Sequence, residues 1–153
     1  MGILWVSQAK PNPLGKDRLH GFTPPRQLAA EWIDIKNIGP DSAALSKIHL
    51  NHIAYQSGCL GGKSEYVITL AGTLAPDEVM RVHSGGAIPL HEMNQEDVGD
   101  VAWHLFTGKH YIWNNACGDM VGLWDGQVWI DKTWYDPYPP EGRVLVREGD
   151  KLV

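Results

Sequence analysis

The stretch DMVGLWDGQVWIDKTWY, residues 119–135, decides the expected fold. Two runs that alternate in polarity flank Asp125-Gly126. This dipeptide is typical of two-residue type I′ β-hairpins, because both turn positions then need a positive φ. The stretch therefore predicts a hairpin of two long antiparallel strands.

Successive side chains of a strand point to opposite faces, so the alternation assigns a face to each residue of this hairpin. Val121 and Leu123 share one side of the first strand, and Val128, Ile130 and Trp134 share one side of the second. We expect these residues to point into the core. The other side, which we expect to face outward, carries Met120, Trp124, Trp129, Asp131, Thr133 and Tyr135.

Similar short runs recur along the chain between Gly and Pro, which supply 17 and 10 of the 153 residues. Such a series of β-branched and aromatic runs predicts an all-β sandwich of two sheets. The expected strands are residues 32–37, 48–55, 65–70, 79–83, 110–113, 119–124 and 127–135. The remaining expected core residues are Ile33 with Ile35, Ile48 with Leu50, Tyr66 with Ile68 and Leu70, and Met80 with Val82.

The two ends of the chain carry weaker strand patterns. Residues 7–30 are rich in Pro, so we expect an extended surface segment outside the core, with one helical turn at 26–30. The Gly-rich and then acidic residues 84–100 predict a long loop between strands. The tail at 143–153 offers one edge strand.

Length and composition indicate one domain over residues 1–153. We expect its core at about residues 31–135, an extended lead-in at 1–30 and a tail at 136–153.

Net charge argues against one class of partner. The chain carries a net charge of −5, whereas a protein that follows a phosphate backbone needs clustered Lys and Arg. We therefore expect no nucleic-acid partner. The sequence also holds no apolar run long enough for a transmembrane helix, and its start, MGILWVSQAK, lacks the features of a signal peptide. These features favour a cytoplasmic protein.

Four segments occur in an order that is characteristic of a known family. They are EWIDIKNIG at 31–39, LAPDEVMRVHSG at 74–85, YIWNNACGDMVGLWD at 111–125 and QVWIDKTWY at 127–135. With the lead-in PNPLGKDR at 11–18, they resemble the bacterial type of lamin-tail domain, the immunoglobulin-like module at the end of nuclear lamins. The resemblance implies an immunoglobulin-like β-sandwich of about seven to nine strands. It also implies a non-catalytic interaction module, and it does not extend to residues 84–100 or beyond 135.

The turn before residue 119 has its own chemistry. Trp113 is expected to close one end of the sandwich. The carboxamides of Asn114 and Asn115 are expected to bind backbone groups of the turn that leads to Asp119.

Cys59 and Cys117 both lie in Gly-flanked segments, whereas the disulfide of antibody domains joins positions inside strands. We interpret them mainly as reduced thiols, with a single disulfide as the alternative. The closely spaced His49 and His52 fall on opposite sides of a strand, so they do not predict a metal site. The sequence contains none of the common catalytic or cofactor-binding motifs, so we expect neither enzymatic activity nor a cofactor.

Five of the seven Trp lie between residues 103 and 134. Trp124, Trp129 and Tyr135 form the predicted outward aromatic patch beside the hairpin. The simpler expectation is that one of the chain ends covers this patch. If neither end covers the patch, we expect it to be a recognition surface for a protein partner or a second copy of the chain, because Trp and Tyr provide large rigid contact areas. The alternatives are a carbohydrate-binding face on the same residues and a metal-dependent hydrolase built on the long loop.

Overall fold

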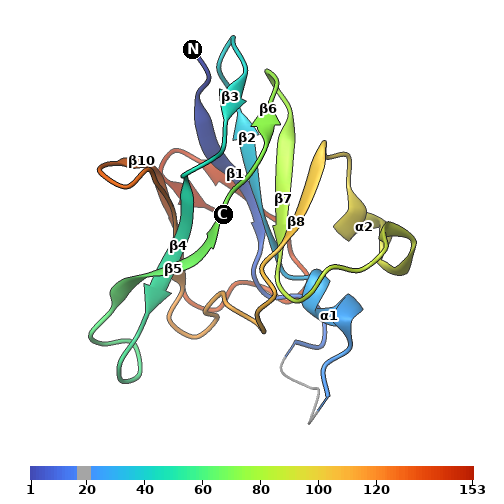
Figure 1. Ribbon diagram of the computed structural model, residues 1–153. Helices are drawn as coiled ribbons and strands as arrows, with labels where there is room; N and C mark the ends of the chain where they lie inside the picture. The colour runs from blue at the N-terminus through green and yellow to red at the C-terminus, as the bar shows by residue number, and fades with distance from the viewer. Residues whose placement is uncertain (17–21) are drawn as a thin grey trace.

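The computed structural model describes residues 1–16 and 22–153, and the protein is all-β, as the sequence predicts (Figure 1). The first half contains β1 (Leu4–Lys10), α1 (Pro25–Ala29), β2 (Trp32–Asn37), β3 (Ala43–Ala44), β4 (His49–Ala54), β5 (Lys63–Thr69), β6 (Thr73–Leu74) and β7 (Val79–His83). The second half contains η1 (Leu90–Glu92), α2 (Gln95–Val98), β8 (Trp103–Phe106), β9 (Asp119–Trp124), β10 (Trp129–Tyr135), β11 (Leu145–Glu148) and β12 (Lys151–Leu152).

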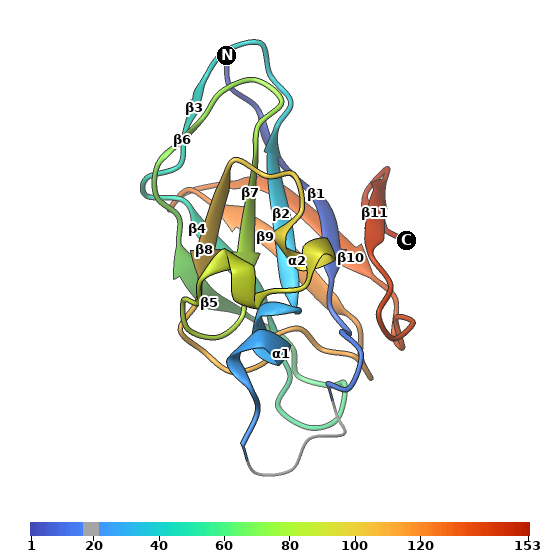
Figure 2. The same cartoon turned by 90° about the vertical axis from the view of Figure 1, so that its right-hand side faces the viewer.

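Ten of the strands form one large sheet in the order β5-β4-β9-β10-β12-β11-β1-β2-β7-β8, and β3 pairs with β6. The sheet curls so that its two halves enclose the apolar core (Figures 1 and 2). Where the halves approach each other, the Val6 amide of β1 donates to Asp131 Oδ2 of β10 at 2.8 Å. The two expected sheets are therefore joined into a continuous one.

Strands with strict alternation have the predicted bounds, namely β2, β7 and β9. Their inward residues are buried, including Ile33 and Ile35 at 0% exposure. On β5, however, Val67 is buried and Tyr66 is 47% exposed, because the β4–β5 register shifts between Leu50 and Asn51. The prediction that Tyr66 belongs to the core was wrong.

The ends of the chain also differ from the prediction. Val6 and Ala9 of β1 are fully buried, and β1 pairs with both β2 and β11. The expected surface lead-in therefore begins with a central strand, and the tail adds β11 and β12 inside the sheet rather than at an edge. The helical turn expected at 26–30 is present as α1. Part of the lead-in, residues 17–21, lies outside the described residues.

Residues 110–113 do not form the expected strand, and a buried carboxylate holds this segment instead. Glu31, at 0% exposure, accepts hydrogen bonds from the Ile112 amide at 2.9 Å, Ser84 Oγ at 2.5 Å and Lys16 Nζ at 2.5 Å. Burial raises the pKa of Glu31, and these contacts oppose that increase. Side-chain hydrogen bonds thus fix a segment that the sheet leaves unpaired.

The 84–100 segment lies between β7 and β8, as expected for a long connection, and contains η1 and α2 (Figure 2).

The β9–β10 hairpin is present, but its turn is longer than predicted. Four residues separate Trp124 from Trp129, and Gly126 alone in this loop has a positive φ, of 101°. Asp125 Oδ1 accepts hydrogen bonds from the amides of Gln127 and Val128, each at 2.8 Å. This side-chain turn replaces the expected type I′ turn.

A β-bulge after Trp129 reverses the faces of the rest of β10. The register with β9 shifts between Trp129 and Asp131, and one extra residue moves every later side chain to the opposite face. Trp134, after the bulge, is therefore 41% exposed. Ile130 lies within the bulge and is 38% exposed, and Val128 lies in the loop before β10 and is 59% exposed. The predicted inward placement of these three residues was wrong. Conversely, Thr133 and Tyr135, predicted to face outward, are buried at 0% and 3% exposure.

Candidate interaction surface

Trp124 and Trp129 meet on the outer face of the hairpin. They are register partners, and their ring centroids lie 4.9 Å apart at an interplanar angle of 61°. Trp129 lies over Gly122, where an added Cβ would come within 2.6 Å of the indole. Gly122 therefore leaves the space that lets Trp129 lie across the hairpin.

Lys132 and Trp134 extend this surface along β10. The Lys132 ammonium lies 5.2 Å from the Trp129 ring centroid and 5.6 Å from the Trp134 ring centroid. A cation at these distances is attracted to the electron-rich ring faces. Lys132 thus connects two indoles that are otherwise separated along the strand.

The surface continues across β4 and β5. His49 is the register partner of Trp124 and contacts Tyr66 edge to face, with ring centroids 5.1 Å apart. We call the set Tyr66, His49, Trp124, Trp129, Lys132 and Trp134 the outer aromatic face. It spans four neighbouring strands, β5, β4, β9 and β10.

Within residues 1–16 and 22–153, neither chain end covers this surface, because parts of both ends are used as strands. The tail folds back as β11 and β12, which pair with β1 and with β10, and the N-terminal segment forms β1. Trp124 and Trp129 are half-buried, whereas Tyr66 and Trp134 are 47% and 41% exposed. The outer aromatic face is consequently open to solvent at Tyr66 and Trp134.

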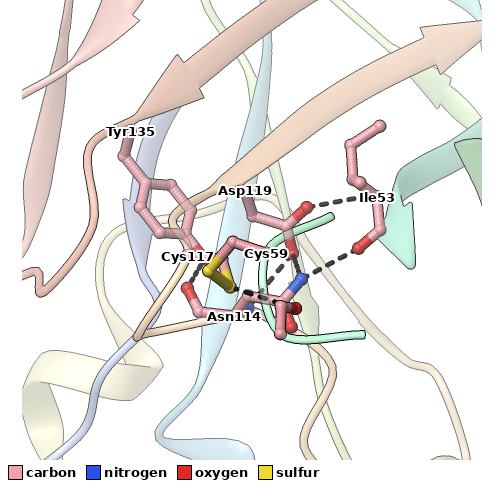
Figure 3. Close-up of a disulfide and its surroundings, with 7 residues drawn as sticks. Ile53, Cys59, Asn114, Cys117, Asp119 and Tyr135 are labelled. Carbon is pink, nitrogen blue, oxygen red and sulfur yellow. Dashed lines mark hydrogen bonds between the residues drawn. A yellow bond between two sulfur atoms is a disulfide. The ribbon is translucent and has the colours of Figure 1, made fainter. Parts of the chain in front are cut away.

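Tyr135 does not belong to this surface. It is only 3% exposed, and its hydroxyl donates to the Asn114 carbonyl at 2.7 Å (Figure 3). Burial raises its pKa well above the usual value. The expectation that Tyr135 joins Trp124 and Trp129 in an outward patch was wrong, for the same reason as for Trp134: the bulge exchanges the two faces.

The inner side of the same hairpin ends in a closed polar cluster around Asp119 (Figure 3). Asp119, 3% exposed, accepts from the amides of Ile53, Met120 and Asn114 at 2.8, 2.8 and 3.1 Å, and from Asn114 Nδ2 at 2.9 Å. Asn114 Nδ2 also donates to the Ile53 carbonyl at 2.8 Å. Asn114 thus satisfies backbone groups, as predicted from the sequence.

Two further members of the predicted turn motif act in packing. Trp113 is 3% exposed and belongs to the core. Asn115 does not bind the turn backbone through its Nδ2 but donates to Asn12 Oδ1 at 3.0 Å. The turn motif is therefore structural.

His52 completes the closed cluster. Its Nδ1 lies 3.0 Å from Asp119 Oδ2, and its Nε2 lies 3.0 Å from Glu65 Oε1. Burial lowers the pKa of His52, but the bonds to Asp119 and Glu65 outweigh burial and raise it overall. His49 on the same strand points to the outer aromatic face, so the two histidines lie on opposite sides, as their spacing predicts.

Cys59 and Cys117 form a disulfide, with Cα atoms 5.4 Å apart (Figure 3). The expectation of reduced thiols was wrong. It compared the pair with a disulfide between strands, whereas this one joins the loop between β4 and β5 to the turn before β9. The link holds the Asn114 turn against the end of β4.

A second enclosed polar pair lies at the end of β7. His83, at 0% exposure, places Nδ1 2.6 Å from the Ala29 carbonyl and Nε2 2.7 Å from His104 Nδ1. A carbonyl only accepts, so the proton of neutral His83 is on Nδ1 and Nε2 accepts from His104. Burial lowers the pKa of His83 to about 4.

Among the described residues, no group of three or more His, Cys, Asp or Glu is arranged to hold a metal ion. Across the same part of the chain, no helix has the length and apolar character needed to cross a bilayer.

Comparisons with known proteins add no relative: no protein-family model matches the chain, and no curated protein is significantly similar to it. Sequence reasoning found Trp124 and Trp129 but missed His49, Tyr66, Lys132 and Trp134. The alternation alone placed Trp134 inward, and nothing local marked the bulge.

Proposed function

We propose that this chain is a non-catalytic interaction module, lamin-tail-like with an immunoglobulin-like β-sandwich, that self-associates through the outer aromatic face. The observation that carries the proposal is the exposure of Tyr66 and Trp134, at 47% and 41%, on the same face as half-buried Trp124 and Trp129. Large exposed apolar patches on soluble proteins are typical of interaction sites. Trp is also enriched among the residues that dominate binding energy.

Charge on the same hairpin favours a second copy as the partner. Asp125 lies at the exposed tip, and Lys132 lies further along β10. Hydrogen bonds from the Val128 and Gln127 amides lower the pKa of Asp125, which keeps its carboxylate ionised. A two-fold interface pairs each patch with itself. Two hairpins packed antiparallel would then place Asp125 of each copy near Lys132 of the other.

A polysaccharide is the second candidate for the same face. Polar side chains lie among its rings: Asn51 Nδ2 donates to Ser64 Oγ at 3.1 Å, and the Tyr66 hydroxyl lies 3.0 Å from Thr69 Oγ1. Aromatic rings next to such hydrogen-bonding groups suit sugar hydroxyls and the apolar faces of sugar rings. The angle of 61° between Trp124 and Trp129 gives no flat platform, which favours the protein partner.

Sedimentation velocity from micromolar to millimolar concentration tests the proposal. The wild-type chain should form dimers as concentration rises, and Trp134→Ser should remain monomeric over the same range. Trp103→Ser is the matched control, because Trp103 is 53% exposed and lies on β8, which contributes no residue to the outer aromatic face.

A wild-type chain that stays monomeric would overturn self-association, as would an equal loss of dimer in both Trp variants. Tryptophan fluorescence of a monomeric wild type that responds to a polysaccharide panel, with the response lost in Trp134→Ser, would replace the proposal by the second candidate.

A further inference from the structure

A groove lies on the other half of the sheet, over β1, β2 and β7, with a cavity volume of about 460 Å³. In Figure 2, β1 is seen between α2 and β11 on this side of the molecule. Part of the floor is a row in which Trp5 pairs with Lys36, and Lys36 pairs with Val79. A cavity of this size is within the range of small-molecule sites.

Two of the charged pairs at the groove are internally neutralised. Arg81 binds Asp34 through two hydrogen bonds, at 2.8 and 2.9 Å. Arg147 binds Asp131 in the same way, at 2.7 and 2.9 Å. Bidentate pairs of this kind are strong and geometrically fixed, so Asp34, Arg81 and Arg147, which line the groove, are held in place and already neutralised.

Two other charges that line the groove remain unpaired. Lys36 is half-buried on the floor and Asp100 is exposed on the wall. Within the part of the chain that the structure describes, neither side chain has a hydrogen-bond or ion-pair partner, and the two side chains do not pair with each other. The Trp5 Nε1–H, next to Lys36 in the row, is shielded from solvent and has no acceptor.

We propose that this groove binds a small zwitterion with an aromatic side chain, such as an aromatic amino acid. The ligand's carboxylate would bind the Lys36 ammonium, beside the Trp5 indole. Its ammonium would bind Asp100. Val79 and Val146, which also line the groove, would contact the flat side chain.

The unpaired charges determine the ligand class. A cation and an anion held apart in one cavity complement a molecule that carries both charges, whereas an anion alone would face repulsion from Asp100. Because Asp100 is exposed, its ion pair adds only modest affinity. We therefore expect millimolar affinity with clear dependence on both ligand charges.

The test is a titration followed at the Trp5 indole N–H signal by NMR. The probes are phenylalanine, phenylalanine amide, which lacks the carboxylate, and N-acetylphenylalanine, which lacks the ammonium. Phenylalanine should shift the Trp5 signal, and each capped probe should bind about fivefold more weakly. The same titration with the dipeptide Phe-Phe shows whether a longer zwitterion fits the spacing of Lys36 and Asp100 better than phenylalanine does.

Lys36→Met and Asp100→Asn should each weaken phenylalanine binding by a similar factor, and they remove no contact that holds the fold. Lys132→Met, on the outer aromatic face, is the charge-matched control and should leave binding unchanged. No shift at Trp5 with any probe, equal binding of all three phenylalanine probes, or equal weakening by Lys132→Met would overturn the proposal. The groove is separate from the outer aromatic face, so either proposal can fail without the other.

Discussion

The two faces of the β9–β10 hairpin differ in how many hydrogen-bond partners their side chains have and in how much of each side chain is exposed to solvent. On the inner face, Asp119 accepts four hydrogen bonds from backbone and Asn114 donors and also contacts His52. On the outer face, the Lys132 ammonium lies near the Trp129 and Trp134 rings, Trp129 and Lys132 are half-buried, and Trp134 is 41% exposed. One hairpin thus carries a closed structural end and an open aromatic surface.

This difference separates stability from recognition. Buried polar groups that lose a partner pay the full cost of desolvation, so changes on the inner face should affect folding. Exposed side chains with few partners contribute little to folding, so changes on the outer face should affect association instead.

The largest effect is expected from Asp119→Ala. It removes the acceptor for several buried donors and leaves them without partners, so we expect the free energy of unfolding to fall by roughly 3–5 kcal/mol. Urea denaturation measures the change. Glu92→Ala, at an exposed carboxylate, is the control and should change stability by less than about 0.5 kcal/mol. Similar losses in both variants would contradict the role given to Asp119.

Removal of the disulfide at the inner end of the hairpin should cause the second largest loss in the free energy of unfolding. Cys59 and Cys117 are 58 residues apart in the sequence, and a cross-link over such a loop stabilises by about 4 kcal/mol in the chain-entropy model. The Cys59→Ser/Cys117→Ser variant should lose this amount in urea denaturation, and reductant should lower the wild type to the same level. Alkylation of both cysteines in the unreduced, unfolded wild type would show that the link is absent.

His83, which pairs with His104 at the end of β7, allows a test of whether a second buried polar group also contributes to stability, through the pH dependence of unfolding. Its folded pKa of about 4 lies below the usual 6.5, so the unfolded chain binds the proton more readily. The His83 contribution is complete above pH 6.5, and about 3 kcal/mol of it is lost as the pH falls to 4.

NMR titration of the His83 ring should give a midpoint near 4, and the His83→Gln variant should lack this part of the pH dependence of unfolding. His91→Gln, at an exposed histidine, should retain it. His52 acts in the opposite direction, because its raised pKa adds stability at low pH that is lost as the pH rises through the folded value. A His83 midpoint near 6.5 would contradict the account.

Alternation in the sequence predicted the regular strands of the fold. β2, β7 and β9 contain clear apolar and polar alternation and begin and end where expected. β1 was not predicted, because the Pro-rich residues that follow it led us to assign the whole segment to the surface. β11 was expected only as an edge strand. Strand pairing between the two ends of the chain is a long-range property that no local pattern contains.

The candidate site was predicted only in part, because it depends on two register shifts, one between β4 and β5 that affects Tyr66 and one, the bulge, between β9 and β10. Trp124 precedes the bulge and was placed correctly, whereas Trp134 and Tyr135 follow it and exchanged faces. The disulfide was only the less favoured alternative for a related reason: the approach of the two Gly-flanked segments that carry Cys59 and Cys117 is set by the folded sheet. Trp113 and Asn114 were easier to predict because their turn is local.

The most direct test of the central claim is the concentration dependence of the seven Trp indole N–H signals in NMR spectra of the wild-type chain. Self-association through the outer aromatic face predicts that the signals of Trp124, Trp129 and Trp134 shift or broaden as concentration rises. The signals of buried Trp32 and Trp113 should stay unchanged. Signals of Trp124, Trp129 and Trp134 that are independent of concentration, or changes confined to Trp5 and Trp103, would contradict the claim.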